Sequence, residues 1–322
     1  MKPLNVGNKA AQDIDAQVAK ILRGLGNPPP PLKLAEVLEL LKLNKGFYSS
    51  QDDGALREVV NRAIIAGKQL IKRPTLLLDA FRKWDIKAFY VPDKKRILLD
   101  SSEPELKWRW NEAHEVIHSI VPWHQDFLHG DNKVSLSPDC HKEIEAEANY
   151  GAGRLLFLQD VFTDFVMSHE VSFELIKESK KEFGNTLTSC MWRLVETLPI
   201  PAVGIVCQHP HYPKPDFDPV KPCRYFICSP SFSARFSFAT EVAMFDLLKE
   251  HCSWKRKGPL AECEVEIVDD SGDRHAFVLE AFNNHYETLC LFRHSHEVRG
   301  SIVVPSSFAA ALVPKGSRQI LP

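Results

Sequence analysis

Apolar residues recur at three- and four-residue steps through most of the first 200 residues, a spacing typical of amphipathic helices. Pro122 and the run of prolines that starts at Pro28 interrupt this spacing, so each of them ends a helix. Between residues 159 and 198 the pattern is shorter and indicates two or three brief helices. The longer predicted helices cover residues 10–25, 33–43, 104–121 and 141–158.

Short apolar runs bounded by turn-forming residues predict strands in two regions. Residues 87–100 contain two such runs around a Pro-Asp-Lys-Lys turn, directly before the helix predicted over 104–121. After residue 200, closely spaced prolines end the helical pattern, and mainly strand-like sequence follows. The strand-like runs are RYFIC, CEVEIVD, HAFVLEAF, ETLCLF and SIVVP, with one helical segment, TEVAMFDLLKEH. We therefore expect an α+β fold whose C-terminal domain of about 120 residues is mainly β.

The composition is that of an ordinary soluble globular protein, and 322 residues are enough for two or three folding units. The 40 Lys and Arg residues nearly balance the 42 Asp and Glu residues, so the whole chain carries no charge that favours nucleic acid or an anionic membrane. We expect no membrane association and no direct nucleic-acid binding. The eight cysteines form no CxxC pair, and the opening residues form no secretory signal, which predicts a cytoplasmic protein with reduced thiols.

The pentapeptide HEVIH, which contains His114, Glu115 and His118, is the strongest chemical signal in the sequence. Two histidines four residues apart on a helix project from one face, one turn apart, so both can reach a single Zn²⁺ ion. A glutamate between them is placed to act as a general base toward a zinc-activated water molecule. The pattern predicts a zinc hydrolase, provided that a third protein ligand exists.

The third ligand has several candidates, because a loop of about 20 residues lets the next helix return antiparallel to the first. Glu145 is preferred, since Asn149 lies one turn later on the same face and can hydrogen-bond a ligand histidine. Geometry alone would also allow His141. The sequence also leaves open whether His124, His129 and His141 assist catalysis or contact the substrate. The full set of candidate ligands is His124, His129, His141, Glu143, Glu145 and Glu147.

The segment AHEVIH, followed by IEAEANYGAGRLL, resembles the ImmA/IrrE family of zinc metallopeptidases, and the match extends over residues 89–158. The resemblance implies a gluzincin-like peptidase in which His114, His118 and Glu145 hold zinc. It places the general base at Glu115, and Asn149 at the position of the asparagine in the family's second-helix motif. The cofactor implied is therefore Zn²⁺.

The resemblance also implies three parts. These are a zinc metallopeptidase-like domain over 1–159, a helical, helix-turn-helix-like linker over 160–199, and a GAF-like regulatory domain over 200–322. The chain departs from the family pattern at three places, one of which is that no proline closes the second helix after its double leucine. Trp110-Asn111-Glu112 stands where the family usually has Phe-Thr-Leu, and Ile117 stands where it usually has Gly.

The function implied by the resemblance is that of an endopeptidase that cleaves a helix-turn-helix transcriptional repressor. Such cleavage relieves repression of stress-response or mobile-element genes. The expected partners are a protein substrate, which is a DNA-binding repressor, and a small molecule that binds the C-terminal domain. Two alternatives remain open: a ligand-sensing adaptor that binds a repressor without hydrolysing it, and a metallopeptidase-like toxin paired with an antitoxin.

Overall fold

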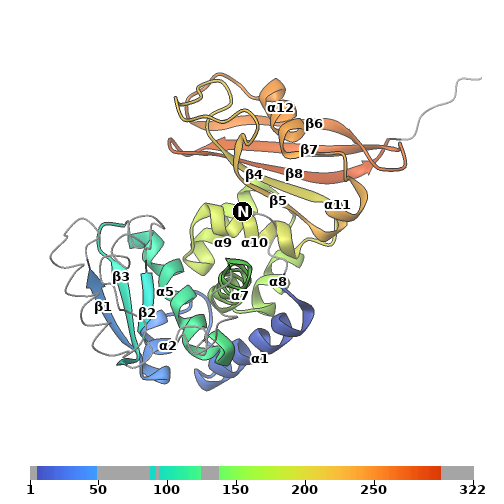
Figure 1. Cartoon of the computed structure of the whole chain (residues 1–322). Coiled ribbons are helices and arrows are strands. Elements are labelled where there is room, and N and C mark those ends of the chain that lie inside the picture. Colours follow the sequence, from blue (N-terminus) through green and yellow to red (C-terminus); the bar gives the residue numbers. More distant parts are fainter. Residues whose placement is uncertain (1–5, 49–87, 92–93, 104, 125–137, 299–322) are drawn as a thin grey trace, which may run out of the picture.

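The structure is a computed structural model that describes residues 6–48, 88–91, 94–103, 105–124 and 138–298. A helical N-terminal part contains a small sheet, and a larger antiparallel sheet forms the C-terminal part (Figure 1). The expected mixed α+β class is therefore confirmed.

The N-terminal part contains a three-stranded sheet in the order β1-β3-β2, with β1 parallel and β2 antiparallel to β3. The two strands expected within 87–100 are β2 and β3. The pattern did not predict β1, because its sequence NKGFY exposes three of five residues and contains a glycine. The elements are α1 (Asn8–Gly24), α2 (Leu34–Leu41), β1 (Asn44–Tyr48), β2 (Ala88–Val91), β3 (Arg96–Asp100), α5 (Glu105–Ile120) and α7 (Pro138–Leu156).

Three short helices follow, as expected: α8 (Asp160–Met167), α9 (Phe173–Phe183) and α10 (Leu187–Thr197). Thr186 caps α10, because its hydroxyl accepts the backbone N–H of Ser189. Its neighbour Asn185 connects two other helices. The Asn185 side chain accepts a hydrogen bond from Arg109 of α5 at 3.0 Å and donates one to the carbonyl of Leu156 at the end of α7, at 3.4 Å.

The C-terminal sheet has the order β5-β4-β8-β7-β6, and all neighbouring strands are antiparallel. The strand-like runs of the sequence give β5 to β8, whereas SIVVP lies outside the described residues. The pattern missed β4 and α11. Strand β4 shows no alternation, since all six of its residues are buried. The elements are β4 (Ala202–Cys207), β5 (Cys223–Cys228), α11 (Pro230–Arg235), α12 (Glu241–His251), β6 (Gly258–Val268), β7 (Arg274–Asn283) and β8 (Thr288–Glu297).

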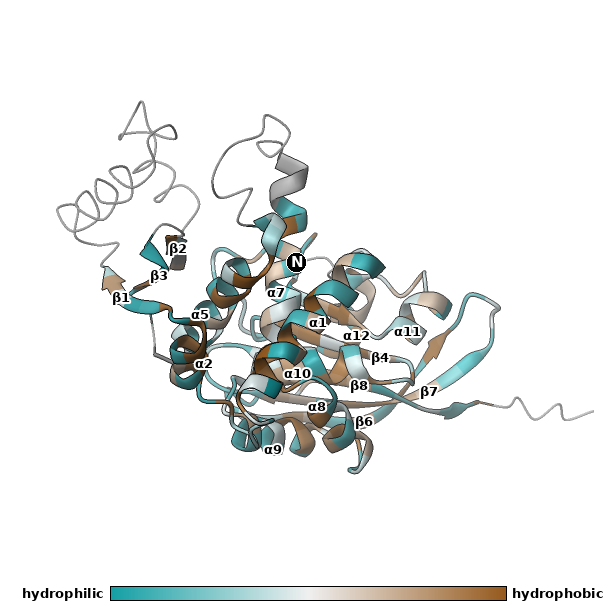
Figure 2. Cartoon of the chain, turned by 90° about the horizontal axis from the view of Figure 1, so that it is seen from below, coloured by the Kyte–Doolittle hydropathy of each residue, from teal (hydrophilic) through white to brown (hydrophobic). Residues whose placement is uncertain are grey.

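Each face of this sheet is covered by helices. Val203 and Ile205 of β4 pack in a core with α11 and α12, while Val206 belongs to a second core that continues through α10 into the N-terminal helices. Hydrophobic and hydrophilic residues accordingly occur side by side along the helices (Figure 2). One hydrophobic core thus contains residues from both sides of the predicted domain boundaries, at residues 159 and 199. The division into three domains therefore stays a prediction. Among the described residues, no helix is long and apolar enough to cross a membrane.

Helices α5 and α7 approach each other closely at Gly151 of α7. A Cβ atom placed there would lie 2.8 Å from Cγ2 and 2.9 Å from Cγ1 of Ile117 of α5, which is fully buried. Ala148 and Ala152 flank this point and are also fully buried. Only a residue without a side chain allows this separation, because Ile117 is branched at Cβ and stiff.

Gly151→Ala and Gly153→Ala form a matched pair that measures this approach. Both variants gain about 0.8–1 kcal/mol of helix propensity. At Gly153 the new Cβ meets only Trp110, at 3.8 Å, whereas at Gly151 it overlaps Ile117. Urea unfolding should therefore find Gly151→Ala about 1–3 kcal/mol less stable than Gly153→Ala. Equal stability of the two variants would show that the helices are not constrained at this contact.

Candidate metal centre

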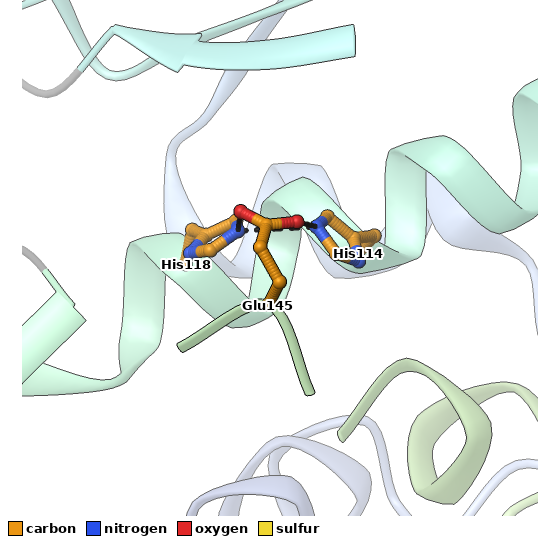
Figure 3. Close-up of side chains that lie close together, drawn as sticks. All are labelled: His114, His118 and Glu145. Carbon is orange, nitrogen blue, oxygen red and sulfur yellow. Dashed lines mark hydrogen bonds and ion pairs between the residues drawn. The ribbon is translucent and has the colours of Figure 1, made fainter. Parts of the chain in front are cut away.

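The two histidines of the motif lie on α5, and Glu145 reaches them from α7. The Glu145 carboxylate lies between the two imidazole rings (Figure 3). Its oxygens are 3.2 Å from Nε2 of His114 and 3.6 Å from Nε2 of His118, and the two Nε2 atoms are 3.1 Å apart. The structure therefore brings together the three residues predicted as ligands.

These separations suit one small cation. Four tetrahedral ligands, each at 2.0–2.1 Å from zinc, lie about 3.3–3.4 Å from one another, and the observed distances of 3.1–3.6 Å bracket that value. Two imidazoles and one carboxylate are also a ligand set found in catalytic zinc sites. Within the described ranges this is the single group of three His, Cys, Asp or Glu side chains placed to share an ion. It can hold a metal ion, although the group itself does not specify which one.

Asn149 determines which nitrogen of His114 faces this group. Its Nδ2 donates to the carbonyl of Glu145 at 2.8 Å, and its Oδ1 accepts from the indole N–H of Trp110 at 3.4 Å, so the amide orientation is settled. Nδ1 of His114 lies 3.2 Å from the same Oδ1 and must therefore be the donor. In the neutral imidazole of His114 the lone pair consequently lies on Nε2, the atom that faces Glu145.

Glu115 is buried beside the centre, 6% exposed, on the side of α5 that contacts β2. Burial raises its pKa to about 7, and the negative charge of Glu145 contributes to the rise. His114 and a hydrogen bond with the Tyr90 backbone act in the opposite direction and favour the ionised form. The predicted general base is thus a buried carboxyl group within electrostatic reach of two of the three candidate ligands.

The remaining candidate ligands lie elsewhere or outside the described residues. Glu147 accepts hydrogen bonds from Nε1 of Trp123 at 2.6 Å and pairs with Nε2 of His124 at 2.9 Å. Glu143 is exposed. His129 and the side chain of His141 lie outside the described residues, so their predicted roles are not tested.

His124 is fully buried, and its ring centroid is 5.0 Å from that of His118. Burial lowers its pKa, which favours the neutral imidazole. It borders the centre without belonging to the three-residue group. Its role as a residue that assists catalysis stays a prediction.

Sequence reasoning missed Trp110, which helps to orient Asn149. A signal was present, because Trp110 lies four residues before His114 and so shares its face of the helix. It also missed the ion pair between Glu112 of α5 and Lys45 of β1, at 2.7 Å. No local signal could have found that pair, since its two residues are far apart in the sequence.

The orientation of α7, which carries Glu145, is held from its other side by Asp15 of α1. The Asp15 carboxylate pairs with Nε of Arg154 at 2.6 Å and accepts the hydroxyl of Tyr150 at 3.0 Å. Its backbone carbonyl accepts the amide of Gln159 at 2.7 Å. Helix α7 is therefore fixed on one side by Ile117 and on the other by this cluster.

No protein-family model matches the chain, and no curated protein matches it in sequence. Among solved structures, a Mycobacterium tuberculosis transcriptional regulator is similar, with 12% sequence identity and a TM-score of 0.48. The match covers 98% of this chain and 95% of that chain. Similarity at this level gives no information about activity.

The first prediction for the site concerns metal content. Elemental analysis of the full chain purified in zinc should find about one zinc per chain, and Glu145→Ala should weaken zinc affinity by more than about 100-fold because an oxygen ligand is lost. Glu143→Ala is the matched control, since Glu143 is an exposed glutamate on the same helix. Equal zinc affinities of the two variants, measured by chelator competition, would exclude Glu145 as a ligand.

The second prediction concerns Asn149. Replacing it by leucine removes the acceptor that fixes the His114 tautomer, so zinc affinity measured by chelator competition should fall about 10- to 100-fold. Asn149→Asp keeps an oxygen acceptor and should lose less. A leucine variant with unchanged affinity would show that another contact orients His114.

Proposed function

We propose that the chain is a zinc-dependent endopeptidase. The observation that carries this proposal is the convergence of His114, His118 and Glu145, at donor separations suited to one ion, beside the buried carboxyl group of Glu115. The sequence resemblance to the ImmA/IrrE family supports it independently of the geometry. In this proposal the C-terminal part has a regulatory role.

The residues divide the work of peptide hydrolysis. His114, His118 and Glu145 hold the ion, and Asn149 keeps His114 in the ligating tautomer. Zn²⁺ bound there supplies Lewis acidity, which activates water and polarises a carbonyl group. Glu115 accepts a proton from the attacking water and returns it to the leaving amine. Its burial excludes bulk water from that transfer.

The substrate reaches the centre in an extended conformation. The Glu145 side chain is 43% exposed, whereas those of His114 and His118 are 13% and 6% exposed, so the centre opens on the Glu145 side. Strand β2 is one of the two edge strands of the small sheet in the described part of the chain, and it contacts α5. A peptide added to this edge would run beside the candidate ligands. A flexible or partly unfolded segment of a partner meets this requirement.

The proposed substrate is a DNA-binding repressor, as the family resemblance implies. The chain does not need to bind DNA itself. Helix α10 packs on β4 and β5, and the side chain of its only basic residue, Arg193, is just 14% exposed. A recognition helix needs several basic side chains free to reach phosphates. The GAF-like assignment of the C-terminal part is supported by an antiparallel sheet with α11 and α12 on one face.

Glu115→Gln tests the mechanism. The amide cannot accept a proton, so cleavage of a co-expressed repressor should fall by at least about 100-fold, while zinc content should remain that of the wild type. Immunoblots of the repressor and elemental analysis measure the two quantities. Glu143→Gln, on the exposed start of α7, should leave both unchanged.

The alternatives give different results in the same experiment. If Glu115→Gln still fully derepresses the target genes, the chain acts as a non-hydrolytic adaptor. If expression arrests growth without any repressor present, the toxin alternative holds. Either result would overturn the proposed peptidase function.

A further inference from the structure

A cavity of about 720 Å³ lies between the helical part and the C-terminal sheet, and none of the three candidate ligands lines it. Its walls come from α5, α7, α10, β5 and the turn between β7 and β8. A cavity of this volume accommodates a molecule of mononucleotide size. It lies on the face of the sheet that α10 covers, opposite to α11 and α12.

Aromatic rings form much of the wall, and their polar atoms already have protein partners. The Trp192 indole donates to Glu196 at 2.7 Å and meets the ring of Tyr225 edge-on at 5.2 Å. The Tyr150 hydroxyl donates to Asp15, and Trp110 donates to Asn149. These side chains therefore offer apolar ring surface to an occupant, which suits a planar molecule.

Arg193 supplies a positive charge to the same cavity. Its side chain is only 14% exposed, and its nearest carboxylate, on Glu196, is 3.6 Å from Nη1. Nε of Arg193 is buried without a hydrogen-bond partner among the residues that the structure describes. A guanidinium has five N–H donors, and leaving even one of them unmet in a buried place costs free energy. Burial also lowers its pKa.

Other charges around the cavity are matched. Lys107 pairs with Glu103 at 3.1 Å, and Arg224 pairs with Glu287. The N-terminal turn of α10 adds the hydroxyls of Thr186, Thr188 and Ser189, at the end of the helix that favours negative charge. Arg193 also has an ion pair, with Glu196, but of the three cations that line the cavity it is the one whose Nε is buried without a hydrogen-bond partner among the described residues, and it lies on the same helix.

We propose that this cavity binds a small aromatic anion, whose ring packs on the tryptophan and tyrosine walls and whose carboxylate or phosphate group meets Arg193. We infer further that an occupant acts on the metal centre. Trp110 and Asn149 line the cavity, and Oδ1 of Asn149 is 3.2 Å from Nδ1 of His114. An occupant that displaces either side chain changes the hydrogen bond that orients a candidate ligand. This second half rests on the proposed function, whereas the binding half does not.

Calorimetric titration of the full-length, metal-free protein tests binding without any need for peptidase activity. The probes are indole-3-acetate and benzoate as carboxylates, and AMP and GMP as phosphates, so the two arms distinguish the kinds of anion. Indole, acetate and inorganic phosphate test ring and charge separately. At least one aromatic anion should bind with a dissociation constant below about 1 mM, and at least about tenfold more tightly than its separate parts. Failure of all four probes to saturate overturns the proposal.

Two variants locate the bound probe. Gly153 lines the cavity, and a Cβ there meets only Trp110, at 3.8 Å, so Gly153→Leu projects into the space and should abolish binding, whereas Gly153→Ala should not. Arg193→Met should weaken binding about 10- to 100-fold. Arg274→Met, which removes an exposed arginine of β7 paired with Glu266, is its control. Unchanged affinity in the well-folded Gly153→Leu variant would place the probe elsewhere and overturn the assignment.

Zinc competition with and without the saturating probe tests the coupling. Zinc affinity should change by about fivefold or more, and zinc should change the probe's affinity by the same factor. Trp110→Phe keeps an aromatic wall but removes the N–H that holds Asn149, so it should reduce the coupling while the probe still binds. Identical zinc affinities would overturn the coupling, and would leave binding in the cavity and the proposed peptidase as separate results.

Discussion

The contact between Gly151 and Ile117 is the constraint on which the metal centre depends. A Cβ on α7 at this point would come within 2.8 Å of Ile117, so the two helices are as close as a branched side chain permits. Ile117 lies between the two motif histidines on α5, and Gly151 lies six residues after Glu145 on α7. The distance that the Glu145 carboxylate must span is therefore set by this packing, and so is the contact between Asn149 and His114.

Three residues of α5 beside the motif histidines each contact another element of the fold. Ile117 is accommodated by Gly151 of α7. Glu112 is buried but paired with Lys45 of β1. The indole N–H of Trp110 donates to Asn149 of α7. These contacts help to fix the position of α5, and none of them involves a group of the three-residue metal centre.

Local spacing was enough to predict the parts of the fold and site that depend on one or two helices. The four-residue interval between His114 and His118, and between Glu145 and Asn149, requires only helical geometry. Strand β4 escaped prediction because burial on both faces erases the alternation that marks a strand. The cavity could not be predicted from local spacing, because the residues that line it range from Glu103 to Glu287 in the sequence. Only tertiary packing brings such distant residues together.

Asp15 has a consequence for the protein's N-terminus. This one carboxylate meets Arg154 and Tyr150, while the apolar stripe of α1, with Ile14 and Val18, covers the neighbouring surface of the core. A recombinant form that starts after α1 would leave the Arg154 guanidinium with only the exposed carboxylate of Asp160, 3.5 Å from its Nη2, and would open a hydrophobic surface to water. The choice of start site in an expression plasmid therefore decides whether the helix that carries Glu145 is supported on both sides or only by Ile117.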